Sequence, residues 1–296
     1  YGDHRDLHLS LRRQRQMCIE TDVQNLYFKP AVGGALFEWD WRAKRYNLLN
    51  NLTRRPEGYH EDLRRAGERG ELVVTGSSEE LETIHTTRVR VKEPDLHKKL
   101  FYDWYRRSSL IDHFLHPDTT LESFAHCQYG ELGDFVNQPY TYHVTERDGR
   151  LELVLCRDGH VWCGEIFAPL RVEKRVVLQA GSGEVTVTYA LTNTGEQEVS
   201  GRFGVECNWG LLGGDGPGAY ISSPRFSPAR LNSLGEHSEI EETSLTVEHL
   251  GISITLRTSR PATLWHFPIE TISNSEAGFE QGYPVSYTHL TLPTKA

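Results

Sequence analysis

Apolar side chains occupy every second position in one segment after another, and this alternation limits the possible folds more than any other feature. It is clearest in Arg150–Cys156 (RLELVLC) and Glu184–Leu191 (EVTVTYAL), and Arg171–Gln179 repeats it. A period of two is that of a β-strand with one buried face. Leu245–Arg257 contains two such runs, separated by Gly251. The pattern predicts strands that each cover one side of a hydrophobic core.

Turn-forming residues separate these runs. Asp-Gly pairs at 148–149 and 158–159 predict hairpin turns, because glycine accepts a positive φ and aspartate tolerates the preceding position. Residues 180–183 (AGSG) and 193–195 (NTG) are turn segments of the same kind. Strands therefore follow one another at short spacing between residues 133 and 279, without the intervening helices of a parallel α/β sheet. This region is predicted to form a sandwich or a barrel.

The first third of the chain has a mixed pattern. Residues 17–28 predict two short strands, and Ala35–Trp41 (ALFEWDW) predicts a third. Pro56–Arg69 is charged and competent to form a helix, with proline at its start. A short helix is expected within 93–107, and 108–115 (SSLIDHFL) is compatible with a strand. The chain is thus predicted to be mainly β, with one or two short helices in its first third.

Charge and cysteine usage exclude several kinds of partner. The formal net charge of −9 argues against binding to the phosphate backbone of a nucleic acid. No segment approaches the roughly 18 apolar residues of a membrane helix, so no membrane partner is expected. Five cysteines without dense spacing favour reduced thiols in a cytoplasmic protein. Fourteen histidines include no HExxH motif and no Cys/His quartet, so neither a metal nor another cofactor is predicted.

Both ends of the chain are set apart from the predicted domain. Residues 1–16 are polar and rich in arginine and histidine, and they are interpreted as a residual linker from an upstream region. The first residue is Tyr1 and not methionine, so the sequence is interpreted as a fragment. Residues 284–296 (PVSYTHLTLPTKA) resemble a translated sequencing adaptor. The prediction is a single β-domain at 17–281, followed by a non-native tail at 282–296.

Four stretches of the sequence together indicate a protein family. They are residues 33–60 (beginning GGALFEWDW), 102–115 (YDWYRRSSLIDHFL), 130–135 (GELGDF) and 265–280 (WHFPIETISNSEAGFE). In these stretches the chain resembles the carboxy-terminal domain of family 57 glycoside hydrolases, the group of 4-alpha-glucanotransferases and alpha-amylases. The resemblance implies a twisted β-sandwich of the galactose-mutarotase-like type. It also implies an upstream (β/α)7 barrel that carries the catalytic Glu and Asp, neither of which has a counterpart in this sequence.

The same resemblance suggests a function. The chain would be an accessory β-sandwich domain of an enzyme that acts on alpha-glucans such as starch, glycogen and maltooligosaccharides. In this hypothesis the domain packs on the catalytic barrel of the same polypeptide, helps to shape the glucan cleft and is inactive alone. Two alternatives are an independent carbohydrate-binding module and a domain that only stabilises the barrel. An exposed aromatic groove would favour binding, and a broad apolar face would favour the structural role.

No catalytic residue is predicted. A retaining glycoside hydrolase needs two carboxyl groups about 5 Å apart across the sugar. Sequence spacing does not show that any two acids meet, and loop caps, ion pairs or solvated groups account for them more simply. The acidic residues in unusual settings are Asp103, Asp112, Glu131, Asp134 and Glu206.

Two segments are predicted to contact substrate. The first is a loop at 111–116 (IDHFLH), in which an acid and an imidazole interrupt an apolar run. These two side chains either line the glucan cleft or form an internal Asp–His hydrogen bond. The second segment is 206–209 (ECNW), which ends a strand before a glycine-rich loop, where a sandwich often presents functional groups. The predicted substrate-binding residues of the two segments are Asp112, His113, Glu206, Asn208 and Trp209.

Tryptophans offer flat apolar faces that stack on pyranose rings, so each is weighed as a sugar contact or a core residue. Trp104 lies among tyrosines and charged residues and completes the predicted substrate-binding set. Trp39 and Trp41 are two apart and share one face of a predicted strand. Trp162 and Trp265 are expected to pack in the core.

Overall fold

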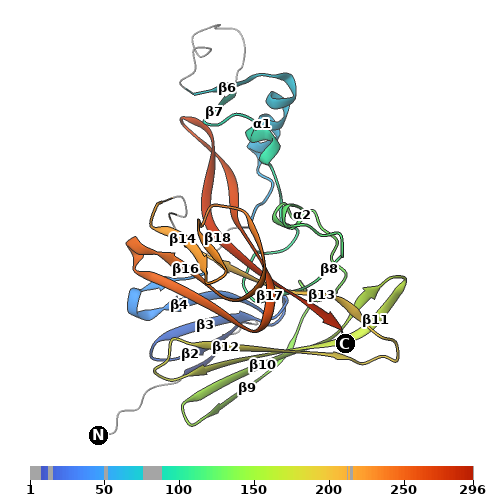
Figure 1. The fold of residues 1–296 in the computed structure, drawn as a ribbon. Helices are drawn as coiled ribbons and strands as arrows, with labels where there is room; N and C mark the ends of the chain where they lie inside the picture. The colour runs from blue at the N-terminus through green and yellow to red at the C-terminus, as the bar shows by residue number, and fades with distance from the viewer. Residues whose placement is uncertain are drawn as a thin grey trace.

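The chain folds into three β-sheets with a few short helical segments, as a computed structural model shows (Figure 1). The structure describes residues 8–12, 16–49, 53–75, 89–211, 213 and 216–295. Strands dominate this part of the chain, so the prediction of a mainly β protein is confirmed. No helix among these residues is long and apolar enough to cross a membrane.

The first sheet is built from the amino-terminal strands in sequence order. Its antiparallel order is β1-β2-β3-β4-β5, each strand pairing with the next. The two strands predicted in 17–28 and the third at 35–41 are confirmed. The strands are β1 (His8–Arg12), β2 (Gln16–Glu20), β3 (Gln24–Lys29), β4 (Ala35–Trp41) and β5 (Tyr46–Asn47).

The second sheet has the order β12-β11-β10-β9 and carries the clearest alternation. In β10 the side chains of Leu151, Leu153 and Leu155 are buried, whereas those between them are half-buried. The apolar period of two seen in the sequence therefore marks the face that covers the core. The strands are β9 (Thr141–Arg147), β10 (Arg150–Cys163), β11 (Ile166–Gln179) and β12 (Val185–Asn193).

The third sheet is the largest and combines distant parts of the chain. Its main path is β15-β14-β16-β17-β18-β13-β8, and the short parallel pair β6–β7 joins it at β18. The β17–β18 hairpin is long and extends well beyond the neighbouring strands (Figure 1). The strands are β6 (Leu72–Val74), β7 (Val89–Val91), β8 (Ile111–Leu115), β13 (Ser200–Trp209), β14 (Ala219–Ser223), β15 (Phe226–Arg230), β16 (Gly235–Val247), β17 (Ile252–Ser275) and β18 (Gly278–Lys295).

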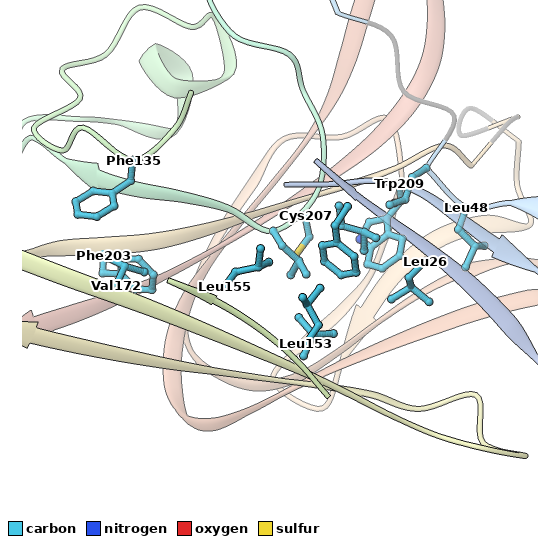
Figure 2. Packing of buried hydrophobic residues seen from close by; sticks show 14 of the residues in the cluster. Leu26, Leu48, Phe135, Leu153, Leu155, Val172, Phe203, Cys207 and Trp209 are labelled. Carbon is cyan, nitrogen blue, oxygen red and sulfur yellow. The ribbon is translucent and has the colours of Figure 1, made fainter. Parts of the chain in front are cut away.

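One hydrophobic core lies between the sheets. Figure 2 shows Leu26 of β3, Leu153 of β10 and Phe203 of β13 in this core, together with Cys207 and Trp209. Each of these side chains is at most 6% exposed. Because one buried cluster contains residues of all three sheets, the strands form a layered sandwich, as predicted.

The helices lie outside the layers. Helix α1 (Gly58–Arg69) packs Leu63 against Ile272 and Phe279 near the outer end of the β17–β18 hairpin. Its N-cap is Glu57, so Pro56 lies one residue ahead of the cap rather than at the first helical position. The short α2 (Leu121–Ala125) lies beyond the first third, and within 93–107 only the single 3-10 turn Leu96–Lys99 forms.

The two predicted Asp-Gly turns have different outcomes. Asp148 and Gly149 have φ values of 52° and 73° and connect β9 to β10, so this hairpin turn is confirmed. The turn predicted at 158–159 is wrong, because β10 continues through it. A Cβ on Gly159 would lie 2.3 Å from Oδ1 of Asp134 and 2.8 Å from the Phe135 ring. Glycine is required there by the close approach of a neighbouring segment, and not by a reversal of the chain.

The last residues belong to β18. The backbone of 286–295 pairs with β13, and that of 278–291 pairs with β17. Backbone pairing depends little on which side chains a strand carries. The non-native origin predicted for 282–296 therefore stays a prediction.

Candidate functional site

A cleft of about 200 Å³ opens where α1 approaches β17. Its lining comes from residues 53–60, 99–102 and 270–273. Three of the four stretches that carry the family resemblance meet here, although they are far apart in the sequence. Only the fold brings these polar and aromatic groups together, so we take the cleft as the candidate site.

Aromatic rings with fixed orientations line part of the cleft. The backbone N–H of Glu57 donates to Nδ1 of His60 at 3.1 Å, so the ring proton lies on Nε2. Nε2 of His60 lies 3.0 Å from the carbonyl oxygen of Ile272 and donates to it. The Tyr59 ring meets the His60 ring edge-on, with centroids 4.7 Å apart, and the Tyr102 hydroxyl lies 3.3 Å from Nδ1. One imidazole thus ties α1 to β17.

Charged groups of both signs also line the cleft. Burial raises the pKa of Glu270, and the positive charge of Lys99 opposes that rise. Nζ of Lys99 donates to Oε1 of Gln281 at 2.5 Å and to Glu93 at 3.3 Å. Carboxylate, ammonium and amide groups beside aromatic rings can hydrogen-bond sugar hydroxyls and stack on sugar faces.

A chain of buried ion pairs runs from the cleft into the sandwich. Nη2 of Arg54, in the cleft lining, lies 2.6 Å from Oδ1 of Asp103. Nε of Arg107 lies 2.9 Å from the same oxygen, and its Nη1 lies 3.5 Å from Oε1 of Glu206. The side chains of Asp103, Arg107 and Glu206 have no exposed surface. The charges compensate one another away from water, which is the condition for burying them.

The inner end of this chain is a histidine between two carboxylates. His113 Nε2 lies 2.6 Å from Glu206, and its Nδ1 lies 2.8 Å from Glu131. Burial alone would lower the pKa of His113, but the hydrogen bonds and charges of Glu131 and Glu206 outweigh it and raise the pKa to about 9. Burial alone would raise the pKa of Glu206, but the charge of Arg107 and the hydrogen bond from His113 lower it to about 2. His113 is therefore cationic at neutral pH.

With His113 protonated, the charges of this cluster cancel. We call the set Arg54, Asp103, Arg107, His113, Glu131 and Glu206 the buried network. It contains three cations and three anions, and the hydroxyl of Tyr105 donates to Glu206 at 2.6 Å. The network joins β8, β13 and the cleft lining into one polar unit.

A second buried pair lies on the other face of β8. Asp112 lies 3.0 Å from Nζ of Lys174 on β11, and both side chains have no exposed surface. The hydroxyl of Tyr140 donates to Asp112 at 2.7 Å, and Lys174 donates to the carbonyl oxygen of Leu110 at 2.5 Å. Burial lowers the pKa of Lys174, while the charge of Asp112 opposes that shift. The pair links two sheets across the core.

The structure changes the interpretation of the first predicted segment. Residues 111–115 form strand β8 with every side chain buried, so the predicted loop is wrong for these residues. Neighbouring residues on a strand face opposite sides, so Asp112 and His113 have separate partners and the predicted Asp–His hydrogen bond is also wrong. Their direct contact with sugar stays a prediction, and in this conformation neither is exposed.

The second predicted segment lies partly in the buried network. Asn208 donates to Oε1 of Glu206 at 2.7 Å, so these two residues and His113 lie together. Trp209 lies elsewhere, where its ring packs on that of Trp39 with centroids 5.5 Å apart. Trp104 is 49% exposed, and its ring contacts that of Tyr105, which reaches Glu206.

The other tryptophans divide between core and surface. Trp265 is 1% exposed, which confirms its predicted core position, but the same prediction is wrong for Trp162, which is 46% exposed. Trp39 and Trp41 line a second groove of about 360 Å³ together with Trp209. Half-buried aliphatic side chains of β12 and β17 form much of that groove.

Two residues of these clusters were missed from the sequence. Lys174 follows Val172 and precedes Val176 at the period that marks the buried face of β11, and a charge at such a position signals a buried partner. Arg54 carries no comparable signal, because its partner Asp103 is 49 residues away in an irregular segment.

Comparison with known proteins identifies the family to which this arrangement belongs. Residues 14–291 match a family model described as alpha-amylase/4-alpha-glucanotransferase, C-terminal. The chain belongs to this family. The match covers all four stretches that carry the resemblance.

Curated relatives share the family but are much longer. The 4-alpha-glucanotransferase of Thermococcus litoralis is 32% identical over 278 residues, which is 93% of this chain and 37% of that protein. Alpha-amylase 1 of Dictyoglomus thermophilum is 30% identical over 90% of this chain and 36% of its own length. The chain therefore spans little more than a third of the curated relatives it matches.

Solved structures agree with the sandwich architecture. The crystal structure of the Thermococcus litoralis 4-alpha-glucanotransferase superposes with a TM-score of 0.74 at 26% identity, over 99% of this chain and 40% of that one. A galactose mutarotase-like protein from Clostridium acetobutylicum gives a TM-score of 0.52 at 9% identity, over 96% of this chain and 87% of its own. The second likeness shows the fold alone, and it confirms the predicted galactose-mutarotase-like type.

Proposed function

We propose that the chain is an accessory β-sandwich domain of a larger enzyme that acts on alpha-glucans, either a 4-alpha-glucanotransferase or an alpha-amylase. The observation that carries this proposal is a match to a carboxy-terminal family over residues 14–291, combined with coverage of only 37% of the Thermococcus litoralis relative. In the proposed enzyme, a catalytic barrel in the same polypeptide performs the chemistry. The substrates are starch, glycogen and maltooligosaccharides.

The state of the acids supports catalysis elsewhere. Each acidic residue considered from the sequence is held in an ion pair or hydrogen bond: Asp103 by Arg54 and Arg107, Asp112 by Lys174, Glu131 and Glu206 by His113, and Asp134 by Arg157. A retaining mechanism needs one carboxyl that attacks the sugar and another that donates a proton. The side chains of Asp103, Asp112 and Glu206 have no exposed surface, and Asp134, which is 31% exposed, is paired with Arg157. We therefore expect no glucan transfer or hydrolysis by the chain alone.

The cleft beside α1 is the proposed contact with the barrel. Residues of three family stretches line the cleft, and Arg54 in its lining pairs with Asp103 of the buried network. In this proposal, His113, Glu206 and Asn208 position the strands behind the cleft, and Asp112 links β8 to β11 across the core. Trp104, which is 49% exposed, is accessible to a ligand. All five cysteines are free thiols, which supports the proposed cytoplasmic location.

A chimaera tests this function. The carboxy-terminal part of the Thermococcus litoralis 4-alpha-glucanotransferase is replaced with residues 14–291 of this chain. The chimaera is expected to disproportionate maltotriose, whereas the 296-residue chain alone is expected to be inactive. The control is the relative truncated at the same point with nothing appended. A chimaera no more active than the truncated relative, or turnover by the isolated chain, would contradict the proposal.

A further inference from the structure

Three exposed rings form a row on the hairpin of β10 and β11. The His160 and Phe167 rings are nearly parallel at 18°, with centroids 4.7 Å apart, and the Trp162 ring lies 4.7 Å from Phe167 on an inclined plane. Trp162 is 46% exposed and Phe167 is 41% exposed, and 45% of the His160 side chain is exposed. We call these three residues the ring row. The end of the hairpin that carries it lies on a different side of the molecule from α1 (Figure 1).

The strand period accounts for the outward position of the rings. Val161 is 1% exposed and Ala168 is 3% exposed, and both face the core. The residues next to them along each strand must then face outward. The three rings therefore lie on the outer face of the sheet and are not part of an incompletely covered core.

One family stretch holds the row from beneath. The backbone N–H of Trp162 donates to the carbonyl oxygen of Leu132 at 2.9 Å. The backbone N–H of His160 donates to Oδ1 of Asp134 at 2.8 Å, and Arg157 donates to Oδ2 at 2.9 Å. The residues that fix the hairpin belong to the stretch 130–135 (GELGDF). The rings are therefore presented on a fixed backbone, which lowers the entropic cost of binding.

Charged groups border the row. The Asp134 side chain is 31% exposed, and its Oδ2 lies 3.9 Å from Nδ1 of His160. Asp158 and Arg171 form an exposed pair at 2.6 Å on the same two strands. Carboxylate and guanidinium groups beside the rings can hydrogen-bond sugar hydroxyls while the rings stack on the apolar faces of the sugar. The row and its border therefore fit a carbohydrate, which is the substrate class of the proposed enzyme.

We propose that the ring row is a surface site that binds a segment of an alpha-glucan chain by stacking. The identity of the sugar rests on the proposed function, and the row lies apart from the cleft beside α1. Trp162, the largest ring, covers one pyranose face, and Asp134 accepts hydrogen bonds from hydroxyls. The site performs no chemistry. It holds a polymeric substrate close to the enzyme, so its loss affects polymers more than short oligosaccharides.

Native affinity electrophoresis of the full chain in gels containing amylopectin tests the site. Wild-type protein is expected to be retarded. Trp162→Ala removes the largest stacking surface, so the dissociation constant for amylopectin is expected to rise about tenfold. The matched control is Tyr142→Ala, which removes an aromatic side chain of the same 46% exposure. Tyr142 is paired with Leu155, which faces the core, so Tyr142 lies on the opposite face of the sheet from the ring row. Leu155 is also seven residues from Trp162 along β10. The Tyr142→Ala variant is expected to migrate like wild type.

The outcomes separate this proposal from the proposed function. Equal retardation of wild type and Trp162→Ala, or no retardation of wild type, overturns the ring-row site. An active chimaera in either case leaves the accessory-domain proposal intact. If Trp162→Ala instead lowers the melting temperature of the chimaera but not of the isolated chain, the row contacts the barrel and the glucan site is wrong. Circular dichroism of each isolated variant confirms that it is folded.

Discussion

The buried network and the ring row reverse the usual placement of side chains. The network buries full charges, with no exposed surface on Asp103, Arg107 or Glu206, whereas the ring row exposes more than 40% of Trp162 and of Phe167. Each arrangement is unfavourable in isolation, since desolvating a charge costs several kcal/mol and exposed aromatic surface forgoes burial. The difference indicates separate roles: the network fixes the fold under the cleft, and the ring row is available to a ligand.

One arginine from each region gives the sharpest contrast and the largest expected effect. Arg107→Met leaves Asp103 and Glu206 with one cation fewer in a buried site, so it should lower the free energy of unfolding by about 3–5 kcal/mol. Arg171→Met removes the exposed pair with Asp158 beside the ring row and should leave the free energy of unfolding close to that of wild type, because solvent screens an exposed pair. Urea denaturation at pH 7 measures both. Similar losses in the two variants would remove the energetic distinction between the regions.

The second buried pair shows whether the penalty comes from an unpaired charge. Lys174→Met leaves Asp112 without its cation and should cost about 3 kcal/mol. Adding Asp112→Leu removes the stranded charge, so the double variant should be more stable than the single one despite carrying more changes. The same urea experiment measures the coupling. A double variant that is less stable than Lys174→Met would mean that the pair matters through packing and not through charge.

The pH dependence of stability tests the charge state inside the network. The pKa of His113 is about 9 in the folded chain, against an ordinary value of 6.5. Because the folded pKa is raised, its contribution is complete below pH 6.5 and is lost as the pH rises through 9. Unfolding free energy should therefore fall by on the order of 2 kcal/mol between pH 6.5 and 8.5. The unfolding free energy of His113→Gln should depend less on pH over this interval. Parallel profiles of wild type and variant would mean that another group takes up the proton.

How well the sequence predicts a feature depends on how far apart along the chain its interacting residues lie. Apolar alternation depends on neighbours along one strand, so the strand at 35–41 and the sandwich are predictable. The pairing of Asp112 with Lys174 joins residues 62 positions apart, and no local pattern specifies it. Asp112 and His113 stand out locally as charges in an apolar run, but their partners come from β11, β13 and the segment near Glu131. The charged positions are therefore visible in the sequence, and their partners are not.

The core position predicted for Trp162 is wrong for a related reason. Composition favours burial of tryptophan, but the strand period decides which side chain faces the core, and here Val161 occupies that position. The Asp-Gly pair at 158–159 was also misleading, since a turn and a close approach both select glycine. Both errors fall on the same hairpin. This hairpin carries the ring row. Its structure is decided by contacts with residues 130–135, and not by the local preferences of tryptophan or of an Asp-Gly pair.

Gly159→Ala connects the ring row to that supporting segment. Its Cβ would lie 2.3 Å from Oδ1 of Asp134, the atom that accepts the backbone hydrogen bond of His160. Overpacking of this kind costs about 1–3 kcal/mol. Because Asp134 must shift, amylopectin retardation should weaken although all three rings are still present. Gly201→Ala is a matched control, because Gly201 also lies within a strand without a positive φ, and a Cβ there would meet nothing within 4 Å. If Gly159→Ala is destabilised yet retains full retardation, the rings bind without the support of Asp134, and stacking alone accounts for the site.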